Sequence, residues 1–425
     1  MRRAFVVRNQ TSACVFALTF ALACMALPLP AEVFSFRLHN RQSSGAPGTD
    51  ASAVLVSPGD DFGRSRSYGF DLGSRVERGE GCVTGSRPLY FSVTLPEGNY
   101  DVKLEFGDAK VATTNTVKAE LRRLMLEQVI TKPGEFIART ITVNIRTPAI
   151  PGDSSVSLKQ REKDDEMINW DGKLTLEFNG ARQGLASLEI NPAQAATLFL
   201  LGDSTVCDQP QEPWNSWGQM LPRFFKPGIA IANHAQSGES IRSSLSANRF
   251  DKVLAEMRPG DWLFLQYGHN DMKDKATNAL ATYKANLKMI VTRTREKGGT
   301  PVLVTSMERK TGIEHDTLAG YPDTVRQVAK EENVALIDLH ALSKALYRSL
   351  GSDLDKAFQD GTHHNSYGSY ELARCVVLGI HQARLPIARL LQDDVPEFNP
   401  ERPDPVADFA IPPSPQASLA KPDGN

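Results

Sequence analysis

Four short polar segments, far apart in the sequence, carry side chains that together could support covalent catalysis by a serine. They are Gly202-Asp203-Ser204-Thr205-Val206, Gln236-Ser237-Gly238, Gly268-His269-Asn270-Asp271 and Asp360-Gly361-Thr362-His363. A serine hydroxyl is a weak nucleophile until a neighbouring base takes its proton, and an imidazole suits that task at neutral pH. These segments therefore predict Ser204 as nucleophile, His363 as general base and Asp360 as the carboxylate that orients the imidazole.

Each segment taken alone has a plainer explanation. A single Gly-Asp-Ser triplet is often only a turn before a helix. His364 is an alternative base, but it follows His363 directly, and consecutive loop residues usually point in different directions. We interpret Asp203 and Asp271 as residues that organise hydrogen bonds around the loops. The chemical interpretation therefore depends on all four segments occurring together.

The elements that would position these segments are read from the apolar residues. Five continuous apolar runs, separated by stretches of helical periodicity such as 283–297 and 321–331, are typical of strands buried on both faces. The runs are Thr197–Leu201, Ile229–Ala232, Trp262–Gln266, Pro301–Thr305 and Val334–Ile337. Such alternation predicts a parallel five-stranded sheet in a three-layer α/β/α domain over residues 194–393. Reactive groups would then gather beyond the carboxyl ends of the strands.

The region before it, residues 32–193, has apolar residues at every second position, as in Phe91, Val93 and Leu95. This period of two indicates half-buried strands, and we expect an antiparallel β-sandwich. Pro96-Glu97-Gly98-Asn99 separates two such runs and favours a hairpin between them.

The four segments, in this order, resemble those of the SGNH, or GDSL, hydrolase superfamily. Trp214, the run Trp217-Gly218-Gln219-Met220 and Gly268-His269-Asn270-Asp271 are similar to the rhamnogalacturonan acetylesterases of carbohydrate esterase family twelve. The resemblance implies a serine esterase that removes acetyl groups from pectin. It also implies an oxyanion hole made by the backbone N–H groups of Ser204 and Gly238 and by the side-chain amide of Asn270. No cofactor and no metal are expected.

Several roles remain open. We expect Trp214 and His269 to line the substrate cleft. The alternative roles are core packing for Trp214 and loop hydrogen bonding for His269. The β-rich region resembles the galactose-binding-like sandwiches of some two-domain relatives, so it either binds glycan or serves as a structural support. Other acyl groups or sugars, as in a xylan acetylesterase, lipase, arylesterase or thioesterase, stay open as alternatives. A non-catalytic glycan-binding protein is the alternative from another class.

The two ends of the chain differ from the rest. Residues 1–31 combine Arg2, Arg3 and Arg8 with the apolar run 13–29, which is typical of a secretory signal peptide and predicts a secreted or periplasmic protein. Residues 394–425 are rich in proline and predict an extended or disordered tail. The net charge of −2 does not favour nucleic acid as a partner. The partner expected instead is an acetylated polysaccharide.

Overall fold

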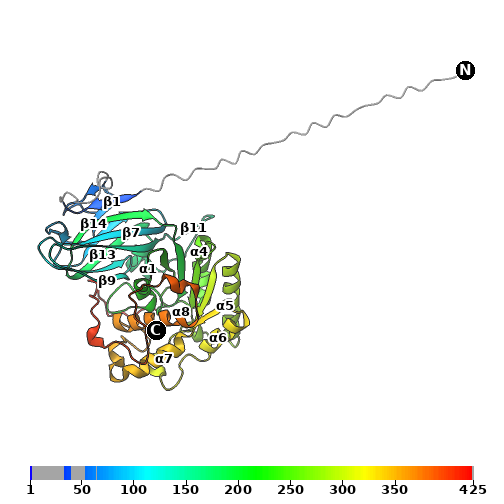
Figure 1. Ribbon diagram of the computed structural model, residues 1–425. Helices are drawn as coiled ribbons and strands as arrows, with labels where there is room; N and C mark the ends of the chain where they lie inside the picture. Colours follow the sequence, from blue (N-terminus) through cyan, green and yellow to red (C-terminus); the bar gives the residue numbers. More distant parts are fainter. Residues whose placement is uncertain (2–32, 40–52, 64, 424–425) are drawn as a thin grey trace. The chain divides into compact units, whose positions relative to one another are not determined.

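The second half of the chain is built around a five-stranded parallel sheet in the computed structural model of this protein (Figure 1). In spatial order the strands are β16 (Ile229–Asn233), β15 (Ala196–Gly202), β17 (Trp262–Gln266), β18 (Thr300–Val304) and β19 (Ala335–Ile337). All five coincide with the predicted apolar runs to within a few residues. The predicted parallel sheet is therefore confirmed.

Helices cover both faces of this sheet, which explains why its strands are apolar along their whole length. Leu198 and Leu200 of β15 pack into the core on one face, and Phe199 and Leu201 pack into the core on the other. The first face is covered by α2 (Trp217–Met220), α7 (Leu339–Leu350) and α8 (Ser366–Gln382). The second is covered by α3 (Ile241–Ser246), α4 (Arg249–Glu256), α5 (Ala279–Glu296) and α6 (Tyr321–Glu331). The domain thus has the three layers that the sequence predicted.

The first half of the chain forms two packed sheets whose strands are antiparallel except for the pair β1 and β2. One sheet contains β10 (Phe136–Ile145), β7 (Gly98–Gly107), β14 (Leu185–Pro192), β1 (Phe34–Arg37), β2 (Val54–Leu55), β5 (Val83–Thr84) and β4 (Glu77–Arg78). The other contains β3 (Tyr68–Asp71), β6 (Leu89–Thr94), β13 (Lys173–Arg182), β8 (Thr113–Ala119) and β9 (Arg123–Thr131). Their inner faces share one apolar core, so the predicted β-sandwich is also confirmed.

The predicted hairpin through residues 96–99 is wrong. Strand β6 pairs with β3 and β13, whereas β7 pairs with β10 and β14 in the opposite sheet. The turn therefore carries the chain from one sheet to the other. Alternating residues such as Phe91 on β6 and Val102 on β7 still face inward, but they meet in the core between the sheets. An alternating pattern reports which side of a strand is buried and does not report which strand lies beside it.

Between β10 and β13 the chain leaves the sandwich and forms β11 (Ala149–Ile150), β12 (Ser154–Ser155) and α1 (Gln160–Asp165). This excursion lies against the α/β half of the chain, where the N–H of Ser157 donates to the carbonyl of Ala247 at 3.0 Å. The first residue of β9 makes a second contact, because Arg123 donates to the carbonyl of Ile231 at 3.0 Å and pairs with Asp208 at 3.3 Å. Residues from 33 onward form one compact unit.

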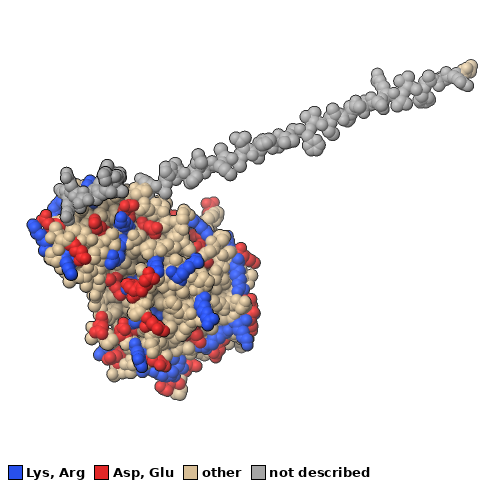
Figure 2. All heavy atoms as spheres, in the orientation of Figure 1, with Lys and Arg blue, Asp and Glu red and all other residues tan. Residues whose placement is uncertain are grey.

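The structure describes residues 1, 33–39, 53–63 and 65–423. The predicted signal peptide thus lies outside the described residues except for Met1. Among the described residues, no helix combines the length and apolar character needed to cross a membrane. Cys82, Cys207 and Cys375 are buried free thiols. Figure 2 shows basic and acidic side chains interspersed over the visible face of the molecule.

The proline-rich tail differs from the disordered alternative, because its extended backbone is tied to the rest of the unit. Lys118 of β8 donates to the carbonyl of Pro412 at 2.9 Å, and Asn179 of β13 donates to that of Pro413 at 2.9 Å. Glu212 then exchanges two backbone hydrogen bonds of 2.8 Å with the tail residues Gln416 and Ser418. The groups that hold the tail lie on β8, on β13 and at Glu212, so the composition of the tail itself does not reveal them.

Candidate active site

Ser204 lies in the turn directly after β15, at the carboxyl end of the parallel sheet. The N–H groups of Val206 and Cys207 both donate to the carbonyl of Asp203, which closes the turn around the serine. Gly202 permits this tight geometry, since a methyl group on it would lie 2.5 Å from Cγ2 of Val206. The local sequence therefore places the Ser204 hydroxyl at the mouth of the sheet.

The structure brings Ser204, His363 and Asp360 into one hydrogen-bonded series. Oγ of Ser204 lies 2.8 Å from Nε2 of His363, and Nδ1 of the same ring lies 3.0 Å from Oδ2 of Asp360. His363 is only 2% exposed, so the series is shielded from bulk water. This arrangement lets the imidazole take the serine proton while the carboxylate stabilises the resulting positive charge.

Asp360 is held in place as firmly as it holds the imidazole. Its Oδ1 accepts the backbone N–H groups of Thr362 and His363, each at 2.7 Å. Partial burial opposes the charge, but the His363 ring and the two N–H groups outweigh it and keep the pKa of Asp360 well below its ordinary value. The carboxylate is therefore ionised wherever an esterase would work.

The other candidate histidines do not compete for the serine. His364 is buried, lies 3.0 Å from the Tyr347 hydroxyl through Nε2, and has its pKa lowered to about 3 by burial and by the nearby His363. His269 lies 3.2 Å from a carboxylate oxygen of Asp203 through Nδ1 and 3.0 Å from the carbonyl of Met307 through Nε2. Both nitrogens of His269 are thus engaged within the protein. These contacts correspond to the loop hydrogen bonding that the sequence offered as the alternative to a contact with substrate.

Trp214 also differs from the expected sugar-binding role. Its side chain is buried, with 5% of the residue exposed. The ring meets the His363 ring edge to face, with centroids 5.8 Å apart, and its N–H donates to the carbonyl of Ser418 in the tail at 3.0 Å. Trp214 therefore supports the catalytic imidazole and the tail, and it offers no open face on which a sugar could stack.

The three predicted oxyanion donors lie on loops that contact one another. Asn270 donates through its side-chain amide to the carbonyl of Glu239 at 3.0 Å, next to Gly238. Within the described residues, neither the Ser204 N–H nor the Gly238 N–H donates to another protein group. Gly238 has a φ of +77°, a conformation that disfavours any side chain. The predicted oxyanion hole requires the N–H groups of these two residues to be free of protein acceptors.

Asp203 and Asp271 support these loops, as the sequence suggested. Asp203 is fully buried and accepts from the N–H and hydroxyl of Thr205 at 3.0 and 2.7 Å. Burial alone would raise its pKa, but His269 and Thr205 hold the pKa below its ordinary value. Asp271 accepts the N–H of Ile241 at 2.9 Å, and burial raises its pKa to about 7.

A cavity of about 530 Å³ opens beside Glu239 and Asn270, which lie on two of these loops. Asn270 and Asp271 line one side of it, and Ser157 and Lys159 from the sandwich excursion line another. Its walls are rich in hydroxyl, amide and charged groups. These groups can exchange hydrogen bonds with a polar ligand such as a sugar.

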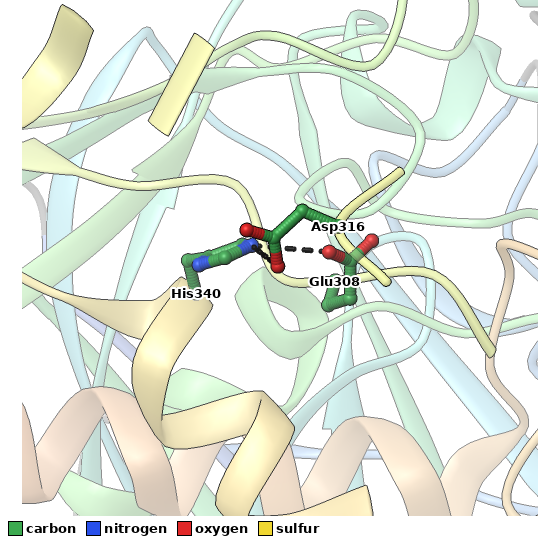
Figure 3. Close-up of side chains that lie close together, drawn as sticks. All are labelled: Glu308, Asp316 and His340. Carbon is green, nitrogen blue, oxygen red and sulfur yellow. Dashed lines mark hydrogen bonds and ion pairs between the residues drawn. The ribbon is translucent and has the colours of Figure 1, made fainter. Parts of the chain in front are cut away.

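Glu308, Asp316 and His340 form a second cluster, whose ligand atoms lie within 4.8 Å of one another (Figure 3). These residue types could hold a cation, but protein groups already engage them. Nε2 of His340 lies 3.1 Å from Glu308, and Lys344 pairs with Asp316. Despite its burial, hydrogen bonds from His340 and from Thr317, Arg309 and other neighbours lower the pKa of Glu308 to about 2. The cluster fixes the loop after β18 through these contacts.

Sequence reasoning missed one residue close to the nucleophile. The Gln209 side-chain amide donates to the carbonyl of Ser204 at 2.7 Å and lies 3.3 Å from Oγ of Ser237. It thereby joins the nucleophile turn to the loop that carries Gly238. A glutamine five residues after a serine carries no recognisable signal, because its role depends on where the second loop lies.

Known proteins that are similar to this chain include three esterases of Bacillus subtilis. The profile of the GDSL-like Lipase/Acylhydrolase family matches residues 200–369. Rhamnogalacturonan acetylesterase RhgT of Bacillus subtilis is 36% identical over 213 residues, which cover 45% of this chain and 91% of RhgT. The probable rhamnogalacturonan acetylesterase YesY of the same organism is 33% identical over 205 residues, covering 45% and 94%. The uncharacterized esterase YxiM is 27% identical over 360 residues, covering 78% of this chain and 88% of YxiM.

Proposed function

Because the chain belongs to the SGNH, or GDSL, hydrolase superfamily and is a carbohydrate esterase of that type, we propose that it removes O-acetyl groups from rhamnogalacturonan. The observation that carries the proposal is the hydrogen-bonded series from Ser204 through His363 to Asp360, with distances of 2.8 and 3.0 Å. The choice of polysaccharide is supported by the names of RhgT and YesY, which match over most of their own length.

The proposed reaction proceeds in two halves. Nε2 of His363 takes the proton of Ser204 as the hydroxyl attacks the acetyl carbonyl, and the oxyanion that forms is stabilised by the N–H groups of Ser204 and Gly238 and the amide of Asn270. The imidazolium then protonates the ester oxygen of the sugar as the C–O bond breaks. The sugar departs with a free hydroxyl, and the acetyl group remains on Ser204. In the second half His363 takes a proton from water, the hydroxide attacks the acetyl-serine, and acetate leaves as Ser204 regains its proton.

We place the sugar in the cavity beside Asn270. The cavity wall contains Ser240, Ser243 and Asn286, whose polar groups can exchange hydrogen bonds with sugar hydroxyls. The acetyl group is small, and the proposal requires no long apolar channel beside Ser204. We extend the proposal to export from the cytoplasm, on the basis of the basic and apolar residues in segment 1–31.

The test is acetate release from a panel of acetylated rhamnogalacturonan, xylan and synthetic acetyl and butyryl esters. Wild type should prefer rhamnogalacturonan and acetyl esters, and Ser204→Ala should keep the melting temperature and lose activity by at least about a thousandfold. The exposed Ser349→Ala is the matched control and should match wild type. Faster deacetylation of xylan would refute the substrate, and turnover by Ser204→Ala would refute the mechanism.

A further inference from the structure

One contact between the sandwich excursion and the oxyanion loop, residues 236–239, is made by an ammonium group. Nζ of Lys159, the residue before α1, donates to the carbonyl of Ser237 at 2.6 Å. The same Nζ lies 3.0 Å from Oε1 of Glu239. Ser237 and Glu239 are the two neighbours of Gly238, and a methyl group on Gly238 would lie 3.4 Å from Nζ. Lys159 therefore holds both sides of the residue whose N–H is assigned to the oxyanion hole.

This contact is built into the core of the interface. The Glu239 side chain is 1% exposed, whereas that of Lys159 is 33% exposed and reaches inward from the surface. A buried carboxylate requires a cation, and removing that cation leaves an uncompensated charge. The nearest alternative, Arg249, lies 3.8 Å from Glu239 and is paired with Glu162. Lys159 thus supplies the closer charge for Glu239.

Lys159 is itself held in a fixed position by α1. Its backbone N–H donates to Oε2 of Glu162 at 2.9 Å, and that carboxylate is anchored on the buried Arg249 of α4. At the other end of α1, Glu166 accepts the side-chain amide of Gln236 at 2.8 Å. Residues that belong to the sandwich half of the sequence thus form hydrogen bonds and an ion pair with the oxyanion loop from Gln236 to Glu239.

A chain of hydrogen bonds also connects these residues to the other two oxyanion donors. Arg161 of α1 donates to Oε1 of Gln209 at 3.2 Å, and Gln209 in turn donates to the carbonyl of Ser204 at 2.7 Å. Asn270 donates to the carbonyl of Glu239 at 3.0 Å. Loss of the Lys159 contact would therefore change the positions of residues in all three loops.

We propose that Lys159 is a positioning residue for ester hydrolysis, which keeps the Gly238 N–H directed at the developing oxyanion. The inference rests on the proposed function, since it takes Gly238 as an oxyanion donor. The sandwich would accordingly contribute to catalysis itself, in addition to any glycan that it binds.

The test compares Lys159→Met, Lys159→Arg and the exposed Lys163→Met on p-nitrophenyl acetate. This small neutral ester has no sugar, so a change in its turnover reports the oxyanion geometry and not glycan binding. Lys159→Met should lower kcat about tenfold to a hundredfold with KM within about twofold, since complete loss of one oxyanion donor costs about a hundredfold or more. Lys159→Arg should recover part of kcat, and Lys163→Met should match wild type.

One further measurement and one further variant separate the outcomes. The dissociation constant of phenylboronic acid, which forms a tetrahedral adduct with the nucleophile, should rise in Lys159→Met by the factor that kcat falls. If Lys159→Met unfolds, Lys159→Gln replaces it, because glutamine keeps a donor and removes the charge. A kcat within twofold of wild type, or a loss confined to KM, would overturn the inference. Turnover by Ser204→Ala would instead count against the proposed function.

Discussion

Replacing Asp360 with asparagine should trap the catalytic imidazole in the wrong tautomer. Oδ1 of Asp360 accepts the N–H groups of Thr362 and His363, and Oδ2 faces Nδ1 of the His363 ring. An asparagine keeps both backbone bonds only if its carbonyl oxygen replaces Oδ1, and its NH₂ group then faces Nδ1. Since an amide N–H can only donate, Nδ1 must accept, and the ring proton moves to Nε2.

The cost of this exchange follows from the position of Nε2, which lies 2.8 Å from Oγ of Ser204. A ring protonated on Nε2 cannot take the serine proton. The same substitution in a serine triad lowers kcat by roughly 10⁴-fold, or about 5 kcal/mol in the activation barrier. We expect Asp360→Asn to show about this loss with p-nitrophenyl acetate, and little change in KM.

The assay is steady-state hydrolysis together with a melting curve. Asp353→Asn is a matched control, because Asp353 pairs with Lys356 at the surface and no contact with a catalytic group is found for it among the described residues. It should match wild type in both measurements. A kcat of Asp360→Asn within tenfold of wild type, at an unchanged melting temperature, would refute the tautomer reasoning.

Two further predictions concern stability. Arg123→Met should lower the free energy of unfolding in urea by about 3 to 5 kcal/mol, because it leaves the buried Asp208 carboxylate without the partner 3.3 Å away; a loss below 1 kcal/mol would contradict the importance of this pair. Glu308→Gln should cost up to about 3 kcal/mol at pH 7, since the pKa of Glu308 is lowered from 4.5 to about 2. A group with a lowered folded pKa stabilises the protein above its unfolded pKa and loses that effect as pH falls. The difference between wild type and Glu308→Gln should therefore shrink from pH 5 toward pH 2, and a difference independent of pH would refute the assignment.

Much of the catalytic half could be predicted because its strands are buried on both faces. Continuous apolar runs such as Trp262–Gln266 leave few alternatives to an interior strand, and the polar residues after each run must then share one edge of the sheet. The sequence therefore predicted which segments the structure brings together around Ser204. Helix α6 follows the predicted range 321–331, because its apolar face repeats at helical spacing.

Contacts between segments distant in the sequence could not be predicted. The hairpin expected at residues 96–99 failed because alternation in β6 and β7 is compatible with pairing to each other or to strands that lie far away in the chain. The buried environment of Trp214 depends on a tail that begins almost two hundred residues later. Neither the strand pairing nor the burial of Trp214 affects the local amino-acid composition. Each can be recognised only once the position of the distant segment is known.

Buried ion pairs connect the two dissimilar folds of the compact unit. Arg122 pairs with Glu212 at 2.5 Å, Arg123 pairs with Asp208, and Lys159 pairs with Glu239, so that cations of the sandwich half face carboxylates of the catalytic half. Removing one member of a pair while the halves stay together would leave an uncompensated buried charge. Two of these carboxylates lie within eight residues of Ser204, and Glu239 is next to Gly238. The same pairs that join the halves therefore also hold the catalytic loops in place.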